Sequence, residues 1–225
     1  MNRQPSHPEI KLLETQQGEV TLSINDGQAM QGWERQLMEE SADMLCGFGS
    51  DFLEVGLGLG LSALRIASHA KTRKHTVVEI YQTVIDLFKK EYPVLPPCLD
   101  ILNADFFRLV HTLPESSLNG IFFDPALPES MWDDGPFWDE VMPAIIRTLR
   151  PGGAFIPFFS TIPVLRWQYL PFFSRIVVER RPFTAYDTTS YTSRTSGDAY
   201  IQCFVKAKEN SFRERPRANT HQAAY

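Results

Sequence analysis

The apolar residues of this chain fall into two alternating patterns. Short runs rich in β-branched and aromatic residues indicate buried strands, and longer stretches in which apolar residues recur every three or four positions indicate amphipathic helices. The strand-like runs are residues 51–55, 75–80, 99–103, 118–124 and 154–159, and the helix-like stretches between them are residues 63–69, 81–92 and 137–149. Strands that alternate with helices predict a parallel sheet with helices on both faces.

The end of the chain departs from this alternation. Residues 174–181 and 199–206 are strand-like and have no full helix between them, so we expect an antiparallel pair that closes one edge of a seven-stranded sheet. Residues 209–225 are polar and lack periodicity, and we expect them to be poorly ordered. The expected organisation is an N-terminal extension (1–29), which could cover a cofactor or substrate, a single Rossmann-like α/β domain (30–208) and this tail.

Composition narrows the class of protein. A chain of 225 residues with 43% hydrophobic residues can bury one core. The net charge of −5 and the scattered basic residues argue against a nucleic-acid partner, and no apolar run approaches the roughly 18 residues that span a bilayer. The three cysteines and five histidines lack the spacing of a disulfide framework or a metal site. We expect a soluble, cytoplasmic monomer or homodimer with a small-molecule partner and no bound metal.

Three glycines follow the first strand-like run. Gly56, Gly58 and Gly60 alternate with leucines at the start of the next helix, where residues without a Cβ let the backbone approach a ligand closely. Such a segment is either a bare tight turn or half of a nucleotide site. Glu79 ends the second strand about 20 residues beyond the glycines, where a carboxylate can accept hydrogen bonds from the hydroxyls of a ribose, unless it is only a solvated strand end. The combination predicts a nucleoside-containing cofactor.

The charge beside the glycines distinguishes two cofactor classes. Glu54 stands two residues before the first glycine, where it would repel the pyrophosphate of a dinucleotide. The same carboxylate suits the cationic amino-acid end of S-adenosylmethionine, directly or through water and backbone amides. An NAD-dependent oxidoreductase is therefore disfavoured, and S-adenosylmethionine is the predicted cofactor.

Further acidic residues are expected at the same edge of the sheet, because ligands of such sheets bind beyond the carboxyl ends of the strands. Glu54, Glu79, Asp105 and Asp124 all lie near such ends and should converge on one cleft. Asp105 could accept the exocyclic amine of adenine while Phe106 contacts the base, or Asp105 could be a plain helix N-cap. Both interpretations stay open.

A second signal lies in residues 30–46, which have the periodicity of a helix. On a helical wheel an apolar stripe contains Glu34 at its centre. The stripe is formed by Met30, Trp33, Leu37, Met38, Ser41, Met44 and Leu45. An unpaired carboxylate buried there would be costly or protonated, so it faces either a structural ion pair with an arginine or a polar ligand. If the helix covers the cofactor cleft, Glu34 and Asp124 form an anionic pair that selects a cationic nitrogen.

This pair suggests a mechanism. An amine or guanidine must lose a proton before its nitrogen can attack a methyl group, and Asp124 is the expected principal proton acceptor. Glu34 would grip and orient the other nitrogens of the acceptor. Ser160 and Thr161, after the fifth strand, either contact a substrate carboxylate or form an ordinary turn, and residues 186–198 are either a substrate lid or a surface loop.

Four segments, together with Met38 and Glu79, carry a resemblance to a known family. The segments are MQGWE (30–34), FLEVGLG (52–58), GIFFD (120–124) and LRPGG (149–153). With them the chain resembles, over residues 30–206, the guanidinoacetate N-methyltransferases and the related arginine N-methyltransferases, within the class I S-adenosylmethionine-dependent methyltransferases. The first and third segments are more specific than the two glycine-containing turns, which recur across most class I methyltransferases.

The resemblance implies a function and a set of site residues. It implies the class I methyltransferase fold and transfer of a methyl group to a guanidino or amino nitrogen of a small molecule, with Glu34 and Asp124 holding the accepting group. Together with the positions derived above, it gives a cofactor site of Met30, Met38, Glu54, Val55, Gly56, Leu57, Gly58, Leu59, Gly60, Glu79, Ile80, Asp105, Phe106 and Asp124.

Two departures from the family pattern bear on the substrate. The family continues after the acid with Thr-Tyr-Pro, whereas this chain has PALP at 125–128, and Thr161 is followed by the apolar Ile162. The substrate is therefore expected to be another guanidino or amino compound. The alternatives are an O-methyltransferase of a small metabolite and a non-catalytic S-adenosylmethionine-binding partner protein.

Overall fold

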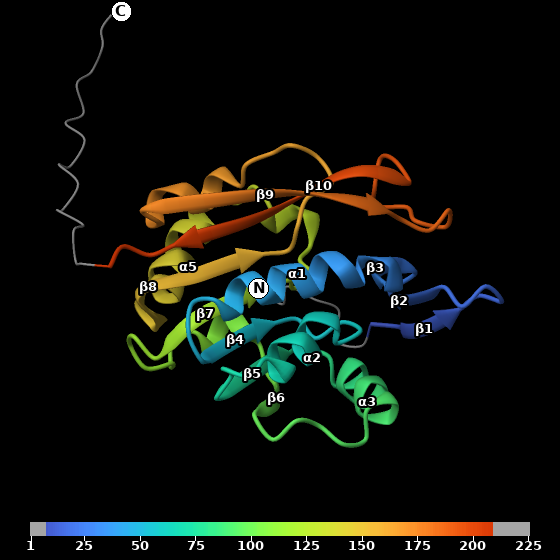
Figure 1. Ribbon diagram of the computed structural model, residues 1–225, viewed down its shortest axis with the longest axis horizontal. Coiled ribbons are helices and arrows are strands. Elements are labelled where there is room, and N and C mark those ends of the chain that lie inside the picture. Colours follow the sequence, from blue (N-terminus) through green and yellow to red (C-terminus); the bar gives the residue numbers. More distant parts are fainter. Residues whose placement is uncertain (1–7, 209–225) are drawn as a thin grey trace, which may run out of the picture.

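A seven-stranded sheet forms the centre of the computed structural model, which describes residues 8–208 (Figure 1). The strands are β4 (Asp51–Val55), β5 (Lys74–Glu79), β6 (Leu99–Asn103), β7 (Leu118–Phe123), β8 (Leu149–Pro157), β9 (Arg175–Thr184) and β10 (Ser196–Val205), in the order β6-β5-β4-β7-β8-β10-β9. Neighbours from β6 to β8 are parallel, whereas β10 is antiparallel to both β8 and β9. The predicted α/β sheet with an antiparallel end is confirmed. The tail predicted at 209–225 lies outside the described residues.

Helices cover both faces of this sheet. They are α1 (Arg35–Cys46), α2 (Leu61–Ser68), α3 (Gln82–Glu91), α4 (Phe106–Leu109) and α5 (Gly135–Thr148). Successive strand residues point to opposite faces, so Phe52 and Phe122 pack with α1, α2 and α3, while Leu53 and Phe123 pack with α4 and α5. Both faces are therefore buried, as in other parallel sheets. Within residues 8–208 we find no helix long and apolar enough to cross a bilayer.

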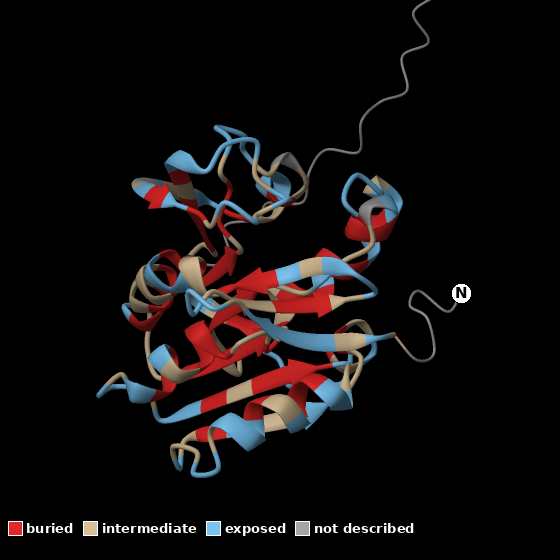
Figure 2. Cartoon of the chain, turned by 90° about the vertical axis from the view of Figure 1, so that its right-hand side faces the viewer, coloured by how far each residue is buried: buried red, intermediate tan, exposed pale blue. Residues whose placement is uncertain are grey.

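A small antiparallel sheet precedes the large one. Its strands are β1 (Ile10–Glu14), β2 (Val20–Ile24) and β3 (Gly27–Gln31). Asn25 and Asp26 have φ angles of 51° and 62° and form the tight turn between β2 and β3, a conformation typical of Asn-Asp-Gly hairpins. In Figure 1 the arrows of β4 and β8 point toward the side on which this sheet lies, and Figure 2 shows the mostly exposed β1 at the front of that side. Within its described residues, the N-terminal segment expected as an extension that could cover a cofactor or substrate thus forms an ordered sheet at the carboxyl edge of the large sheet.

The helix predicted over residues 30–46 begins later than expected. Met30 pairs with Leu22 in the β2–β3 ladder, a short 3₁₀ turn (η1, Gly32–Glu34) follows, and α1 starts at Arg35. The backbone amide of Gln31 donates to Glu34 Oε1 at 2.6 Å, which stabilises the turn. The expected start was wrong because pairing in the small sheet overrides the helical periodicity of the first five residues.

The LRPGG segment lies inside β8 rather than before it. Leu149 pairs with Leu118 and Ala154 pairs with Gly120, so β8 contains a bulge between these two pairs. Gly152 adopts a left-handed φ of 78° within it. The bulge lets the strand begin earlier than its apolar run predicted.

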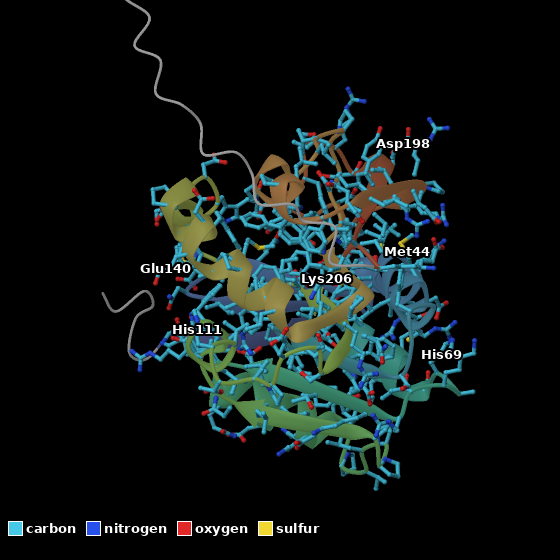
Figure 3. The ribbon with its side chains drawn as sticks, turned by 90° about the vertical axis from the view of Figure 1, so that its left-hand side faces the viewer. Met44, His69, His111, Glu140, Asp198 and Lys206 are labelled. Carbon is cyan, nitrogen blue, oxygen red and sulfur yellow. The ribbon has the colours of Figure 1, made fainter. Side chains whose placement is uncertain are left out.

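At the opposite end of the parallel strands, where they begin, side chains close the sheet. Figure 3 looks at this amino side of the parallel strands, with Lys206 near its centre. Lys206 Nζ donates to the backbone oxygens of Ile146 and Leu149, at 2.8 and 2.6 Å, and so satisfies carbonyls at the end of α5. The carboxyl edge, by contrast, is open.

Candidate active site

A cleft of about 760 Å³ opens at the carboxyl edge of the sheet. Its lining comes from the segments that follow β4, β5, β6 and β7, from the small sheet and from the loop between β9 and β10. The predicted site residues among the lining are Met30, Glu34, Val55, Gly56, Gly58, Glu79, Ile80, Asp105, Phe106 and Asp124. The structure therefore brings most of the sequence-predicted residues together in one space.

The glycine turn depends on two close approaches. Gly56 has a φ of 87°, and a Cβ there would lie 2.2 Å from the backbone oxygen of Asp124. Gly58 has a φ of 53°, and a Cβ there would lie 2.6 Å from Met30 Sδ. Leu59 also donates its amide to this sulfur at 3.2 Å. Only glycine permits this arrangement, which packs the turn between the end of β7 and the small sheet.

Glu79 lies at the cleft and also holds the glycine turn. Its two carboxylate oxygens accept hydrogen bonds from the amides of Leu57 and Tyr81, both at 2.9 Å. Burial raises the pKa of Glu79 above its ordinary value, and these amide hydrogen bonds oppose that shift. The residue is therefore ordered by the turn, as expected of a group that positions a ligand and not of a solvated strand end.

Glu54 lies beneath the turn and does not line the cleft. Its side chain is fully buried on the face covered by α2, because it shares the strand parity of Phe52. Ser62 Oγ donates to Glu54 Oε1 at 2.5 Å, and His75 Nε2 lies 3.0 Å from Oε2. The carboxylate thus contacts side chains of the protein itself, which disfavours the direct contact with the methyl donor; the contact through water and backbone amides, the other expectation, stays a prediction.

Asp124 follows β7 and faces the cleft. Its backbone amide donates to the oxygen of Val55 at 2.9 Å, and its carboxylate has no hydrogen-bond partner among the residues that the structure describes. Burial raises the pKa of Asp124 well above its ordinary value, and the charges of Glu34 and Glu54 raise it further, while Arg166 opposes the shift. The carboxyl group is held where a cation would stabilise its charged form.

Glu34 faces the same cleft from the 3₁₀ turn before α1. It is 7% exposed, and its Oε1 accepts hydrogen bonds from the amide of Gln31 at 2.6 Å and from the hydroxyl of Tyr191 at 2.5 Å. Burial raises the pKa of Glu34 to about 7, against these two hydrogen bonds. No arginine pairs with Glu34 within residues 8–208, so the ion-pair interpretation of this acid is not supported.

Tyr191 is a cleft residue that the sequence did not indicate. It lies in the β9–β10 loop and stacks on Trp33 with ring centroids 6.1 Å apart. Gln28 ties this loop to the small sheet, because its Nε2 donates to the oxygen of Thr188 and its Oε1 accepts from the amide of Ser190, both at 2.7 Å. The run rich in serine, threonine and tyrosine at 186–198 predicted either a substrate lid or a surface loop; the place of Tyr191 beside Glu34 depends on the contacts of this loop with the small sheet.

The position of Asp105 fits both of its interpretations, a helix N-cap and a residue of the cofactor cleft. Its Oδ1 accepts from the amide of Phe107 at 2.9 Å, which makes it the N-cap of α4, and its side chain also lines the cleft. Phe106 lies beside it, 4% exposed, and lines the same part of the cleft. A capped helix end next to an aromatic ring is compatible with the predicted adenine contact.

Several predicted residues are not brought to the cleft. Met38 is buried in the core on the α1 face. Ser160 Oγ donates to the oxygen of Ile162 at 2.8 Å, so Ser160 and Thr161 form the ordinary turn that was the alternative interpretation. Neither they nor Leu57, Leu59 and Gly60 line the cleft; these last three shape the glycine turn from within.

The sheet order, with a cleft at the carboxyl ends of its strands, is that of the class I methyltransferase fold. A family model described as guanidinoacetate N-methyltransferase matches residues 11–167, which is more than half of the chain. The chain belongs to this family. The resemblance drawn from the four sequence segments is confirmed.

Known relatives are consistent with this placement. Protein arginine N-methyltransferase 2 of Yarrowia lipolytica is 28% identical over 160 residues, which are 67% of this chain and 32% of that protein. The chain thus spans about a third of the length of this curated relative.

Solved structures with low sequence identity share the fold alone. Spermidine synthase from Thermotoga maritima superposes with a TM-score of 0.70 at 16% identity, over 92% of this chain and 72% of that one. The N-methyltransferase NodS from Bradyrhizobium japonicum superposes with a TM-score of 0.55 at 14% identity, over 78% of this chain and 97% of that one.

S-adenosylmethionine is the cofactor of this family and fold class, and the residues present fit it. The backbone at Gly56 and Gly58 has no room for side chains, and Glu79 lies at the adjacent strand end. The ring of Phe106 and the carboxylate of Asp105 line the cleft after β6. A nucleoside can therefore lie against backbone between an acidic and an aromatic side chain.

We expect Gly56→Ala to destabilise the fold and weaken binding of S-adenosylhomocysteine. The left-handed φ and the contact with the Asp124 oxygen should together cost about 1–3 kcal/mol of unfolding free energy or more. Urea unfolding and calorimetric titration measure the two effects. Gly135→Ala is the matched control, since a Cβ there meets nothing within 4 Å. Equal losses in the two variants would contradict the role of Gly56.

We expect Glu34→Gln to stabilise the protein at alkaline pH. The amide oxygen of glutamine can accept both hydrogen bonds of Oε1, and it carries no charge. Because the folded pKa of about 7 exceeds the ordinary 4.5, wild type loses stability relative to the variant between pH 4.5 and 7. The difference should approach roughly 3 kcal/mol above pH 7. Urea unfolding across pH measures it, with the exposed Glu14→Gln on β1 as control; a pH-independent difference would refute the shift.

Proposed function

We propose that the protein transfers a methyl group from S-adenosylmethionine to a guanidino or amino nitrogen of a small molecule. The observation that carries the proposal is the pair of carboxyl groups, Glu34 and Asp124, that face one cleft without a basic partner among the described residues. The names of two similar proteins, an arginine N-methyltransferase and an N-methyltransferase, support the choice of nitrogen.

The donor would occupy the part of the cleft over β4, β5 and β6. Glu79 would accept hydrogen bonds from the ribose, and Asp105 and Phe106 would hold the base. When bound, S-adenosylmethionine supplies an electrophilic methyl group. Asp124 connects this part of the cleft to the acceptor, because its backbone packs on Gly56 while its side chain faces the open space.

The two carboxyl groups would bind the acceptor and manage its proton. A cation between them offsets the unfavourable burial of both charges, so binding of the acceptor lowers the pKa of each group. Asp124 would orient the reacting nitrogen and take up its proton, and Glu34 would hold a second nitrogen of a guanidinium or the remaining hydrogens of an ammonium. Tyr191 fixes the orientation of Glu34 through its hydroxyl.

We expect Asp124→Asn to reduce kcat for an amine or guanidine acceptor by about 10²-fold or more, while the affinity for S-adenosylhomocysteine changes little. Radiolabelled S-adenosylmethionine and a panel of guanidines, amines and phenols provide the assay, and calorimetry measures cofactor affinity. Asp139→Asn, an exposed change on α5, is the control.

Three outcomes would contradict the proposal. Full turnover by Asp124→Asn would exclude this role of the carboxylate. Label on the oxygen of phenols, with none on nitrogen, would indicate an O-methyltransferase. Binding of S-adenosylmethionine by wild type without turnover of any acceptor would indicate a non-catalytic binding protein.

A further inference from the structure

We infer that the methyl acceptor is a guanidine or amine with an apolar or aromatic body and no acidic group. The inference rests on the proposed function and concerns the part of the cleft beyond the reacting nitrogen. It goes beyond family membership, because the description of the matching family names an acid, guanidinoacetate, whose carboxylate would need a partner.

The acceptor half of the cleft can be separated from the donor half by sheet order. The donor residues follow β4, β5 and β6, whereas Asp124 follows β7, on the other side of β4. We define the acceptor wall as the cleft-lining residues that come after Asp124 in the loop between β7 and α5, which are residues 125–128, Met131 and Trp132, together with Phe158 after β8. Every one of these side chains is apolar or aromatic.

The indole nitrogen of the acceptor wall is hydrogen-bonded within the wall. Trp132 Nε1 donates to the backbone oxygen of Leu127 at 3.2 Å, and the Trp132 ring packs edge-on against Phe158 with centroids 5.5 Å apart. Trp132 is 42% exposed, so an apolar ring lies at the mouth of the cleft. Such a surface gains from contact with an apolar group of a ligand and offers nothing to a carboxylate.

The distribution of charged groups in the cleft also disfavours a ligand carboxylate at the acceptor wall. Its described acidic lining residues are Glu34, Glu79, Asp105, Asp124 and Glu140, and its described basic ones are Arg108 and His111. Both basic residues follow β6: Arg108 Nε lies 3.6 Å from Asp105, and His111 lies at the edge of the molecule in Figure 3. Within the described residues no basic side chain belongs to the acceptor wall, so a ligand carboxylate there would meet only Glu34 and Asp124.

Arg166 lies behind the acceptor wall rather than in it. Its guanidinium stacks on the ring of Phe158 at 3.9 Å and donates to the backbone oxygen of Phe158 at 3.2 Å. Its charge acts on Asp124, but Phe158 lines the cleft and Arg166 does not. The buried Nε of Arg166 has no hydrogen-bond partner among the residues that the structure describes. If the acceptor were an acid, Arg166 would therefore be the group to pair with its carboxylate.

The turn at Ser160 and Thr161, which the sequence suggested as a contact for a substrate carboxylate, forms hydrogen bonds within the protein. Ser160 Oγ both donates to the oxygen of Ile162 and accepts from its amide, at 2.8 and 3.2 Å. Ser160 further exchanges backbone hydrogen bonds with Tyr200, at 2.7 and 3.0 Å. The hydroxyl and the nearby amides are therefore occupied within the protein, which removes the carboxylate contact considered from the sequence.

Matched acceptors that differ only in one carboxylate test the inference. The pairs are benzylguanidine with 4-(guanidinomethyl)benzoate, butylguanidine with 4-guanidinobutyrate, and benzylamine with 4-(aminomethyl)benzoate. With labelled S-adenosylmethionine and the whole chain, we expect kcat/KM to be at least about tenfold higher for the member of each productive pair that lacks the carboxylate, since a buried unpaired carboxylate is strongly rejected.

A cation placed in the acceptor wall should reverse this preference. In Leu127→Lys the carboxylated member should gain at least about tenfold relative to its partner, because it then pairs with the new ammonium. Trp132→Lys, at a more exposed position, provides a second variant if Leu127→Lys does not fold. Val164→Lys is the control, since Val164 is 49% exposed and does not line the cleft.

The outcomes separate this inference from the proposed function. Preference for the carboxylated members by wild type would overturn the inference and leave N-methylation intact; its loss in Arg166→Gln would identify Arg166 as the partner. Equal rates within each pair would also overturn it. If no guanidine or amine accepts label although the cofactor binds, the proposed function fails and the inference with it.

Discussion

The absence of a side chain at residue 56 is the constraint on which the cleft depends. A Cβ there would lie 2.2 Å from the oxygen of Asp124, and the Asp124 amide donates to Val55 at 2.9 Å. Gly56 in turn donates its amide to the oxygen of Val78 at 2.9 Å. The end of β7, the glycine turn and the end of β5 are thereby joined at the centre of the sheet. Because this unit is built from backbone contacts, the position of Asp124 is tied to that of the glycine turn.

Four of the acidic residues at this edge differ in how far the protein satisfies them. Glu54 is enclosed with Ser62 and His75, although its buried Oε2 has no hydrogen bond within residues 8–208, and Glu79 accepts two backbone amides. Glu34 uses only one carboxylate oxygen, and the Asp124 carboxylate has no hydrogen-bond partner in the described part of the chain. Burying a carboxylate without full compensation costs stability, and of the incompletely satisfied groups Glu34 and Asp124 face the cleft, where an external cation can reach them. The stability of the empty protein is lowered where the ligand binds.

Local patterns predicted the large sheet and much of the cleft. The alternation of apolar runs predicted the seven strands, and the carboxyl ends of parallel strands necessarily share one edge, which placed Glu79, Asp105 and Asp124 together. Glu34 was found because an acid stood at the centre of an apolar stripe. That argument reached the correct side chain although its helix was wrong at the start, because a position that faces the interior in a helix also faced it in the 3₁₀ turn. The small sheet was missed because its strands are short and β1 is mostly exposed, although Asn25 and Asp26 before a glycine are a hairpin signal.

The sequence by itself determined the elements, their order and the chemistry available at the edge of the sheet, because strand and helix periodicity and the conformational freedom of glycine act over a few neighbouring residues. Only the tertiary structure decided which carboxylates reach open space. Glu54 points under the turn by strand parity, and Tyr191 reaches Glu34 from 157 residues away along the chain. The apolar character of the acceptor wall was visible in residues 125–128, but its distance from any basic side chain was not. Such placements depend on packing between segments distant in sequence, where local propensity carries no information.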